Sequence, residues 1–146
     1  MSMPPRKTNV GVLHGAWGEN VAAEYLRLRG YEIVERNSRP CRWDARLEID
    51  IVAYDKTEDV MVFVEVKQHR THVEGERRLR SITKKKKALL RTASRAWLRV
   101  NRWRGAHRFD VIEVYGEPNA RVRAEIDHIE RVELFATPTR FVNWAE

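Results

Sequence analysis

Two apolar segments separated by a short polar turn constrain the fold of this chain more than any other feature. Residues 47–54 (LEIDIVAY) and 60–67 (VMVFVEVK) are rich in valine and isoleucine, and a polar turn joins them. Segments of this composition favour strands, and the turn predicts an antiparallel hairpin. One face of the hairpin is wholly apolar and must be buried. Its members are Leu47, Ile49, Ile51, Ala53, Val60, Val62, Val64 and Val66.

The opposite face of the hairpin carries charge at the end far from the turn. With a symmetric turn, Asp50 faces Glu65 and Glu48 faces Lys67. Opposed carboxylates on a covered sheet repel each other and are costly unless a cation neutralises them. Oxygen ligands of this kind suit Mg²⁺ or Mn²⁺ better than Zn²⁺. The alternative is an exposed strand end with solvated charges, and a slip or bulge would also separate the two carboxylates.

The rest of the sequence predicts helices around a mixed sheet. The remaining expected elements are a helix over 10–29, a strand over 31–37, a helix over 80–102 and strands over 107–115 and 121–132. The order helix, three strands, helix, two strands is typical of an α/β fold with a helix on each face. The length of 146 residues suits one domain. We place it at 10–136, between a flexible N-terminus (1–9) and a C-terminal tail (137–146).

The positive charge of the chain is concentrated in one segment. Residues 67–108 hold 15 lysines and arginines against two acids, a net charge of +13, whereas the rest holds 13 basic and 19 acidic residues, a net charge of −6. Nucleic-acid phosphate is the commonest partner of such a surface, and a solvated basic helix is the plainer alternative. No apolar run is long enough for a signal peptide or a membrane span, so we expect a cytoplasmic protein without a membrane partner.

Several segments together resemble a known family. Residues 18–37 (GENVAAEYLRLRGYEIVERN), EIDIVAYD, FVEVKQHR, ITKKKKALLRTASRAWL and RFDVIEV occur in the order found in the YraN-like family of small bacterial proteins. An aspartate followed by a hairpin and Glu-x-Lys is also the motif of PD-(D/E)xK nucleases. In motif order the family is similar to the archaeal Holliday-junction resolvases.

This resemblance implies a restriction-endonuclease-like fold of three α/β/α layers and a metal-dependent phosphodiesterase site that acts on DNA. Asp50, Glu65 and Glu48 would bind Mg²⁺ or Mn²⁺, Lys67 would orient water and stabilise the phosphate, and Glu19 would be an accessory acid. The substrate would be structured or branched DNA, for which a homodimer is an option. Leu47 departs from the family pattern, which has glycine there. A nucleic-acid-binding module that does not cut therefore stays as the alternative.

The second predicted helix and the loop before it supply the candidate nucleic-acid contacts. On a helical wheel, a basic stripe that includes Lys84 lies opposite an apolar stripe that includes Leu89, Trp97 and Val100. Lys86 falls on the apolar side, so we expect it to reach the edge of the metal site. The expected contacts are Gln68, Arg70, Arg77, Arg78, Lys84, Lys86, Lys87, Arg91 and Arg95.

Overall fold

The predicted hairpin forms the centre of a five-stranded sheet in the computed structural model, which describes residues 10–70 and 83–134. The strands lie side by side in chain order. They are β1 (Tyr31–Ser38), β2 (Ile49–Asp55), β3 (Val60–His69), β4 (Ala106–Tyr115) and β5 (Glu125–Ile129). Only the β3–β4 pair is parallel, so the sheet is mixed, as the sequence predicted.

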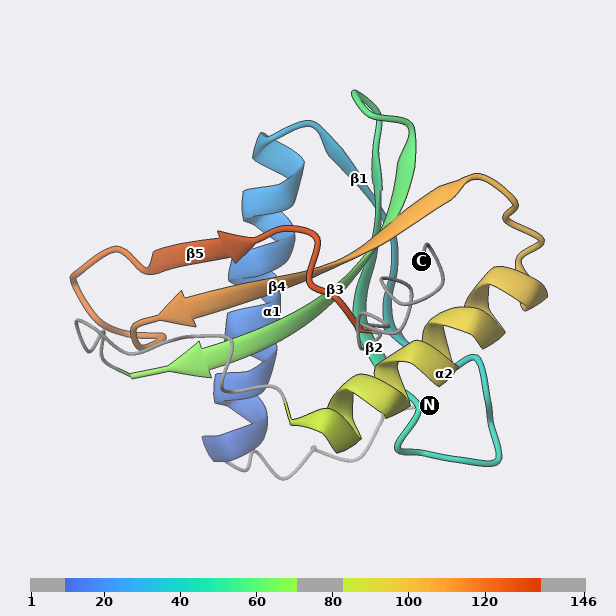
Figure 1. The fold of residues 1–146 in the computed structure, drawn as a ribbon. Helices are drawn as coiled ribbons and strands as arrows, with labels where there is room; N and C mark the ends of the chain where they lie inside the picture. Colours follow the sequence, from blue (N-terminus) through green and yellow to red (C-terminus); the bar gives the residue numbers. More distant parts are fainter. Residues whose placement is uncertain (1–9, 71–82, 135–146) are drawn as a thin grey trace, which may run out of the picture.

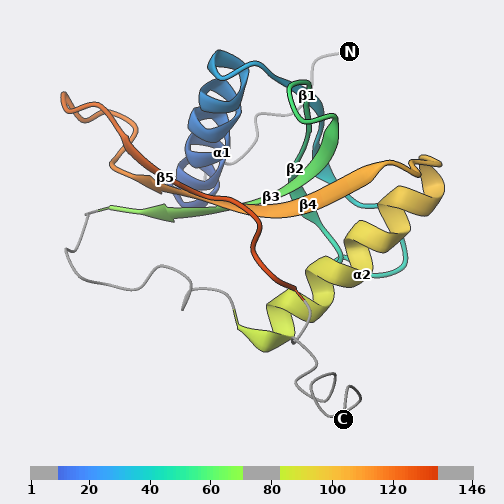
Figure 2. The ribbon, with the colours of Figure 1, turned by 45° about the horizontal axis from the view of Figure 1, so that its top comes forward.

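Two helices cover opposite faces of the sheet and give three α/β/α layers (Figures 1 and 2). The first is α1 (Val10–Leu28), and the second is α2 (Lys84–Val100), which makes the crossover between the parallel strands β3 and β4. This is the restriction-endonuclease-like architecture expected from the sequence. Neither helix is long and apolar enough to cross a membrane. The cytoplasmic location, the homodimer and the single domain over 10–136 stay predictions, and residues 1–9 and 137–146 lie outside the described ranges.

The register of the central hairpin is the predicted one. The partners run from Ile51 opposite Val64 to Asp55 opposite Val60. Alternation along the strands then sends side chains to two separate cores. On the α1 side, Ala22 and Leu26 pack against Val62. On the α2 side, Phe63 meets Trp97 edge to face, with ring centroids 5.5 Å apart.

The residues at and just before the start of β2 depart from the predicted alternation. Leu47 and Ile49 are buried, as expected, but they belong to the core under α2 rather than sharing the α1-side core with Ile51. Pairing between β2 and β3 begins only at Ile51, whereas Ile49 pairs with Ser38 of β1. The chain is therefore released from β3 at this point, and its side chains no longer follow the alternation of the hairpin.

Helix α2 ends two residues earlier than predicted and strand β5 is shorter than predicted, whereas residues 80–82 of the predicted helix lie outside the described residues. Helix α2 begins at Lys84 and ends at Val100, and Val100 is exposed rather than part of the apolar stripe. Leu90 and Ser94 are buried in its place, because the helix packs its middle turns on the sheet. Strand β5 covers only Glu125–Ile129, the part that pairs with β4.

A buried polar network ties the sheet together on the α1 side. Arg108 donates hydrogen bonds to Asp110, Asp55, Glu58 and the Tyr31 hydroxyl, at 2.7–3.3 Å. Asp110 is fully buried and also lies 2.8 Å from His128 Nε2. These groups come from β1, β2, β4, β5 and the turn between β2 and β3. The network therefore acts as a polar clamp within the sheet.

Candidate metal and nucleic-acid site

The carboxyl groups of Asp50 and Glu65 come together where β2 separates from β3. Pairing of the two strands ends at Ile51 opposite Val64, so the next pair, Asp50 opposite Glu65, is not formed. The Asp50 side chain takes the place of the missing backbone partner, because its Oδ2 accepts a hydrogen bond of 2.8 Å from the Val66 amide. This bond fixes the Asp50 carboxylate between the two strands, beside Glu65.

Glu65 is a buried acid with an unsatisfied oxygen. Its residue is only 4% exposed, and its Oε2 is buried without a hydrogen-bond donor among the described residues. Burial, and then the negative charge of Asp50, raise the pKa of Glu65 to about 7. Burial raises the pKa of Asp50 as well. A proton held between the two carboxyl groups would satisfy Oε2, and so would a cation bound by both.

This burial makes the stability of the protein depend on pH. A carboxyl group whose pKa is raised in the folded state favours folding when protonated, and this contribution falls as the pH rises from the unfolded value through about 7. In EDTA, we expect Glu65 to lower the free energy of unfolding by up to roughly 3 kcal/mol between pH 5 and pH 8. Urea unfolding at both pH values measures this difference.

The matched variants for this measurement are Glu65→Gln and Glu32→Gln. Glutamine at position 65 cannot ionise, so the fall in stability should largely disappear. Glu32 is an exposed carboxylate on β1, and its neutralisation should leave the fall unchanged. An equal pH dependence in Glu65→Gln and the wild type would show that this carboxyl group does not titrate as described.

Two lysines from different elements flank the acid pair. The ammonium groups of Lys67 on β3 and Lys86 on α2 each lie 3.6 Å from Glu65 Oε1. Lys86 thus points from the first turn of α2 toward the sheet, where the helical wheel placed it. Its contact with phosphate stays a prediction, as does the catalytic role of Lys67.

The start of α2 places lysines where a helix disfavours them. Lys84 to Lys87 occupy the first turn, which contains no acid, although the N-terminal end of a helix carries partial positive charge. The Thr83 side chain caps the helix and accepts a hydrogen bond of 3.1 Å from the Lys86 amide. An anion at this end would relieve the charge, because helix N-termini and lysine ammonium groups both bind phosphate.

The Thr83 cap should contribute measurably to stability. We expect Thr83→Ala to lower the free energy of unfolding by about 0.5 to 2 kcal/mol, because the Lys86 amide loses its side-chain acceptor. Thr83→Ser keeps the hydroxyl and should remain near the wild type. Chemical denaturation of the three proteins measures the effect, and equal losses in both variants would contradict a capping role.

The two other predicted acids lie near the pair but have their own partners. Glu19 on α1 lies 3.6 Å from Arg36, and burial followed by the charge of Asp50 raises its pKa. Glu48 lies 3.3 Å from Arg39. Within residues 10–70 and 83–134, neither joins Asp50 and Glu65 in a group of three possible metal ligands within 4.8 Å. Glu48 as a ligand and Glu19 as an accessory acid therefore stay predictions.

The one close group of that kind in the described ranges consists of Asp110, His128 and Glu130. It lies in the polar clamp on the α1 side, and Arg108 already supplies its positive charge through the hydrogen bonds to Asp110. Hydrogen bonds from His128 and Arg108 outweigh the effect of burial and hold the pKa of Asp110 below its usual value. We therefore read this group as structural.

Gly18 of α1 leaves room for the side chain of Gln68, one of the predicted nucleic-acid contacts. The sequence did not lead us to expect this role of Gly18. A Cβ at Gly18 would lie 2.5 Å from Gln68 Oε1 and 3.4 Å from Gln68 Cβ. The Gln68 side chain thus lies against the helix at a point where a side chain on residue 18 would force it to move. A glycine inside a predicted helix was the available signal, since it lowers helix propensity and needs a packing reason.

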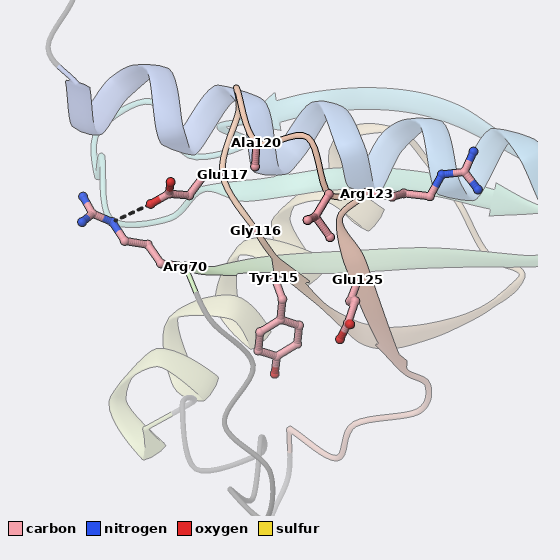
Figure 3. A pocket seen from close by; sticks show the side chains of 8 residues that line it. Arg70, Tyr115, Gly116, Glu117, Ala120, Arg123 and Glu125 are labelled. Atoms are coloured by element: carbon pink, nitrogen blue, oxygen red, sulfur yellow. Dashed lines mark ion pairs between the residues drawn. The ribbon is translucent and has the colours of Figure 1, made fainter.

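Arg70 borders a hollow at the far end of β3. The hollow has a volume of about 420 Å³ and is formed by the end of β3 and the turn between β4 and β5. At its rim Arg70 forms an ion pair with Glu117 (Figure 3), with 3.8 Å between Nε and Oε1. Asp50 and Glu65 are not among its lining residues. It is thus a separate surface feature, which shares only Arg70 with the predicted contacts.

The remaining predicted nucleic-acid contacts form only part of the basic stripe expected on α2. Lys84 and Arg95 on α2 are exposed, whereas Lys87 and Arg91 are half-buried. Arg91 donates a hydrogen bond of 3.3 Å to the carbonyl oxygen of Leu134. The other two predicted contacts, Arg77 and Arg78, lie outside the described residues.

Fold and site together define a class: an α/β/α protein of the restriction-endonuclease-like type, with an acid pair and a lysine where the central hairpin opens. The chain belongs to the Uncharacterised protein family UPF0102, whose pattern matches residues 18–114. This confirms the family expected from the motifs.

Relatives of the same family name cover most of the chain. The UPF0102 protein of Desulfosudis oleivorans is 43% identical over 108 residues, which is 73% of this chain and 82% of that protein. The UPF0102 protein of Herpetosiphon aurantiacus is 31% identical over 82% of this chain and 93% of its own length. That of Mycobacterium tuberculosis is 36% identical over 89% and 99%.

Proposed function

We propose that this protein is a metal-dependent endonuclease that hydrolyses phosphodiester bonds in DNA, with structured or branched DNA as its substrate. The observation that carries the proposal is the buried, unsatisfied Oε2 of Glu65 beside the Asp50 carboxylate. A purely structural acid pair would be expected to have donors for its buried oxygens. A divalent cation bound by both carboxylates would remove the repulsion between them and would also satisfy Glu65 Oε2.

The residues of the site fit such a reaction. Asp50 and Glu65 would hold Mg²⁺ or Mn²⁺, which when bound would supply an activated water and neutralise charge on the phosphate. Binding would remove the negative charge that Glu65 presents to Lys67 and Lys86, which now lie 3.6 Å from it. The two ammonium groups would then be free to contact the phosphate. Lys67 would orient the attacking water and stabilise developing charge, and Lys86 would fix the phosphate at the start of α2.

The basic residues of α2 support nucleic acid as the substrate. Four lysines at the start of the helix oppose the helix dipole, so their placement costs helix stability and serves no packing purpose for the exposed Lys84 and Lys85. A polyanion bound along this end would offset the cost. Binding by such residues should weaken steeply as the salt concentration rises.

Cleavage of labelled DNA tests the proposal. Junction, flap, duplex and single-stranded substrates are incubated with the protein and Mg²⁺ or Mn²⁺, alongside Glu65→Gln and the surface control Glu32→Gln. We expect cleavage by the wild type and by Glu32→Gln, and none above background by Glu65→Gln. Equal cleavage by Glu65→Gln and the wild type would refute the assignment of the site.

A second candidate function is a nucleic-acid-binding module without cleavage. It is favoured by the Arg39–Glu48 ion pair, because a predicted metal ligand then already has a cation as its partner. It predicts salt-sensitive DNA binding that survives Asp50→Asn, with no cleavage with either metal. Binding and cleavage assays on the same preparation distinguish the two functions.

A further inference from the structure

The loop between β1 and β2 presents an aromatic side chain to solvent. Trp43 is 81% exposed, whereas Trp97 is buried and Trp17 and Trp103 are partly buried in the two cores. It is the only exposed tryptophan in the described ranges. An indole left this open gains nothing from packing, so the fold itself does not account for it.

The loop holds Trp43 in a defined position. Cys41 and Leu47, on either side of it, are buried in the core under α2. Between them, the Asp44 amide donates to the Cys41 carbonyl at 3.2 Å, and the Leu47 amide donates to the Asp44 carbonyl at 3.1 Å. Asp44 also accepts bonds from the amide and guanidinium of Arg46. Trp43 is thus presented by an ordered turn, which lowers the entropy cost of binding a ligand there.

The surroundings of Trp43 are basic. Arg42 is exposed beside it, and the same loop carries Arg39 and Arg46, which have acidic partners. Figures 1 and 2 both show this loop running beside α2, closer to the middle and later turns of the helix than to its basic first turn. The loop has no second exposed large apolar side chain, so it offers no apolar patch for a protein partner. An aromatic face among cations is the usual arrangement for a nucleobase and its phosphate.

We propose that Trp43 is a stacking platform for an unpaired nucleobase, which makes the substrate a DNA with single-stranded character next to the cleavage site. This inference rests on the proposed function. In a duplex both faces of each base are covered by its neighbours, so the indole can stack only on a base that is unpaired. Trp43 lies seven positions before Asp50, a span of at most about 25 Å of chain, so one strand can contact both.

The test compares binding to an end-labelled single-stranded oligonucleotide and to its duplex, by fluorescence anisotropy in EDTA so that no cleavage occurs. Trp43→Ala should weaken single-strand binding by about 5- to 150-fold, the effect of losing one base stack. Duplex binding should change by less than about 2-fold. Trp43→Phe should restore most of the affinity, and Leu28→Ala, which truncates an equally exposed side chain on α1, should change neither.

The outcomes separate this inference from the proposed function. If the wild type binds both DNAs and Trp43→Ala changes neither affinity, or lowers both equally, the stacking platform is overturned. The nuclease proposal is then unaffected. A wild type that binds neither DNA at low salt would overturn both. A dimer that dissociates on Trp43→Ala while single-strand binding is unchanged would assign Trp43 to self-association and also overturn the platform.

Discussion

Replacing Asp50 with asparagine should lower metal-dependent DNA cleavage by at least about 10³-fold, because loss of a metal-binding carboxylate removes several kcal/mol of transition-state stabilisation. The substitution keeps an oxygen that can accept the hydrogen bond from the Val66 amide, so the local backbone should stay in place. Single-turnover cleavage with Mg²⁺, at saturating protein, measures the effect on the chemical step.

The same substitution should make the metal-free protein more stable. Asparagine removes the repulsion with Glu65, and its amide can donate to the unsatisfied Oε2. We expect a gain of about 1 to 3 kcal/mol in the free energy of unfolding at pH 8 in EDTA. A gain in stability with a loss of activity indicates a site kept for function. Activity lost because the protein unfolds would contradict this account, and Glu32→Gln controls for the change in net charge.

The second large effect concerns the polar clamp rather than the site. Arg108→Ala should lower the free energy of unfolding by about 3 to 5 kcal/mol, because it leaves the fully buried Asp110 without its main cation. The hydrogen bonds to Asp55 and Tyr31 are lost as well, so β1, β2 and β4 lose their common partner. Urea unfolding at pH 7 measures the change.

Arg131→Ala is the matched control for this variant. Arg131 also pairs with Glu58, but its side chain is 66% exposed and its backbone amide, not its side chain, donates to Asp110. Its removal should cost less than about 1 kcal/mol. Similar losses in the two variants would show that the buried position of Arg108 does not give the clamp its strength.

The sequence predicted the parts of the fold that depend on local periodicity. Valines alternating with larger residues in β3 defined the hairpin faces, and a short symmetric turn set the register that runs from Asp55 opposite Val60 to Ile51 opposite Val64, next to Asp50 and Glu65. The wheel position of Lys86 followed from the helical repeat alone. These features depend on neighbours within one element or one hairpin, for which spacing is sufficient.

Features set by contacts between distant segments could not be predicted. The hydrogen bond from the Val66 amide to Asp50 depends on the separation of β2 from β3, which no pattern in either strand indicates. The pairing of Glu19 with Arg36 and of Glu48 with Arg39 depends on how α1 and the β1–β2 loop meet the sheet. Burial of Leu47 was predicted, but its place in the core under α2, rather than on the α1 side, was not.

The most direct test of the metal site is a crystal grown or soaked with Mn²⁺ and measured at a wavelength that gives anomalous scattering from manganese. The account predicts a peak between the Asp50 and Glu65 carboxylates, with Lys67 and Lys86 released from Glu65, and no such peak in crystals of Asp50→Asn. The account would be contradicted if a crystal saturated with Mn²⁺ showed no anomalous peak between the two carboxylates and both lysines still lay beside Glu65.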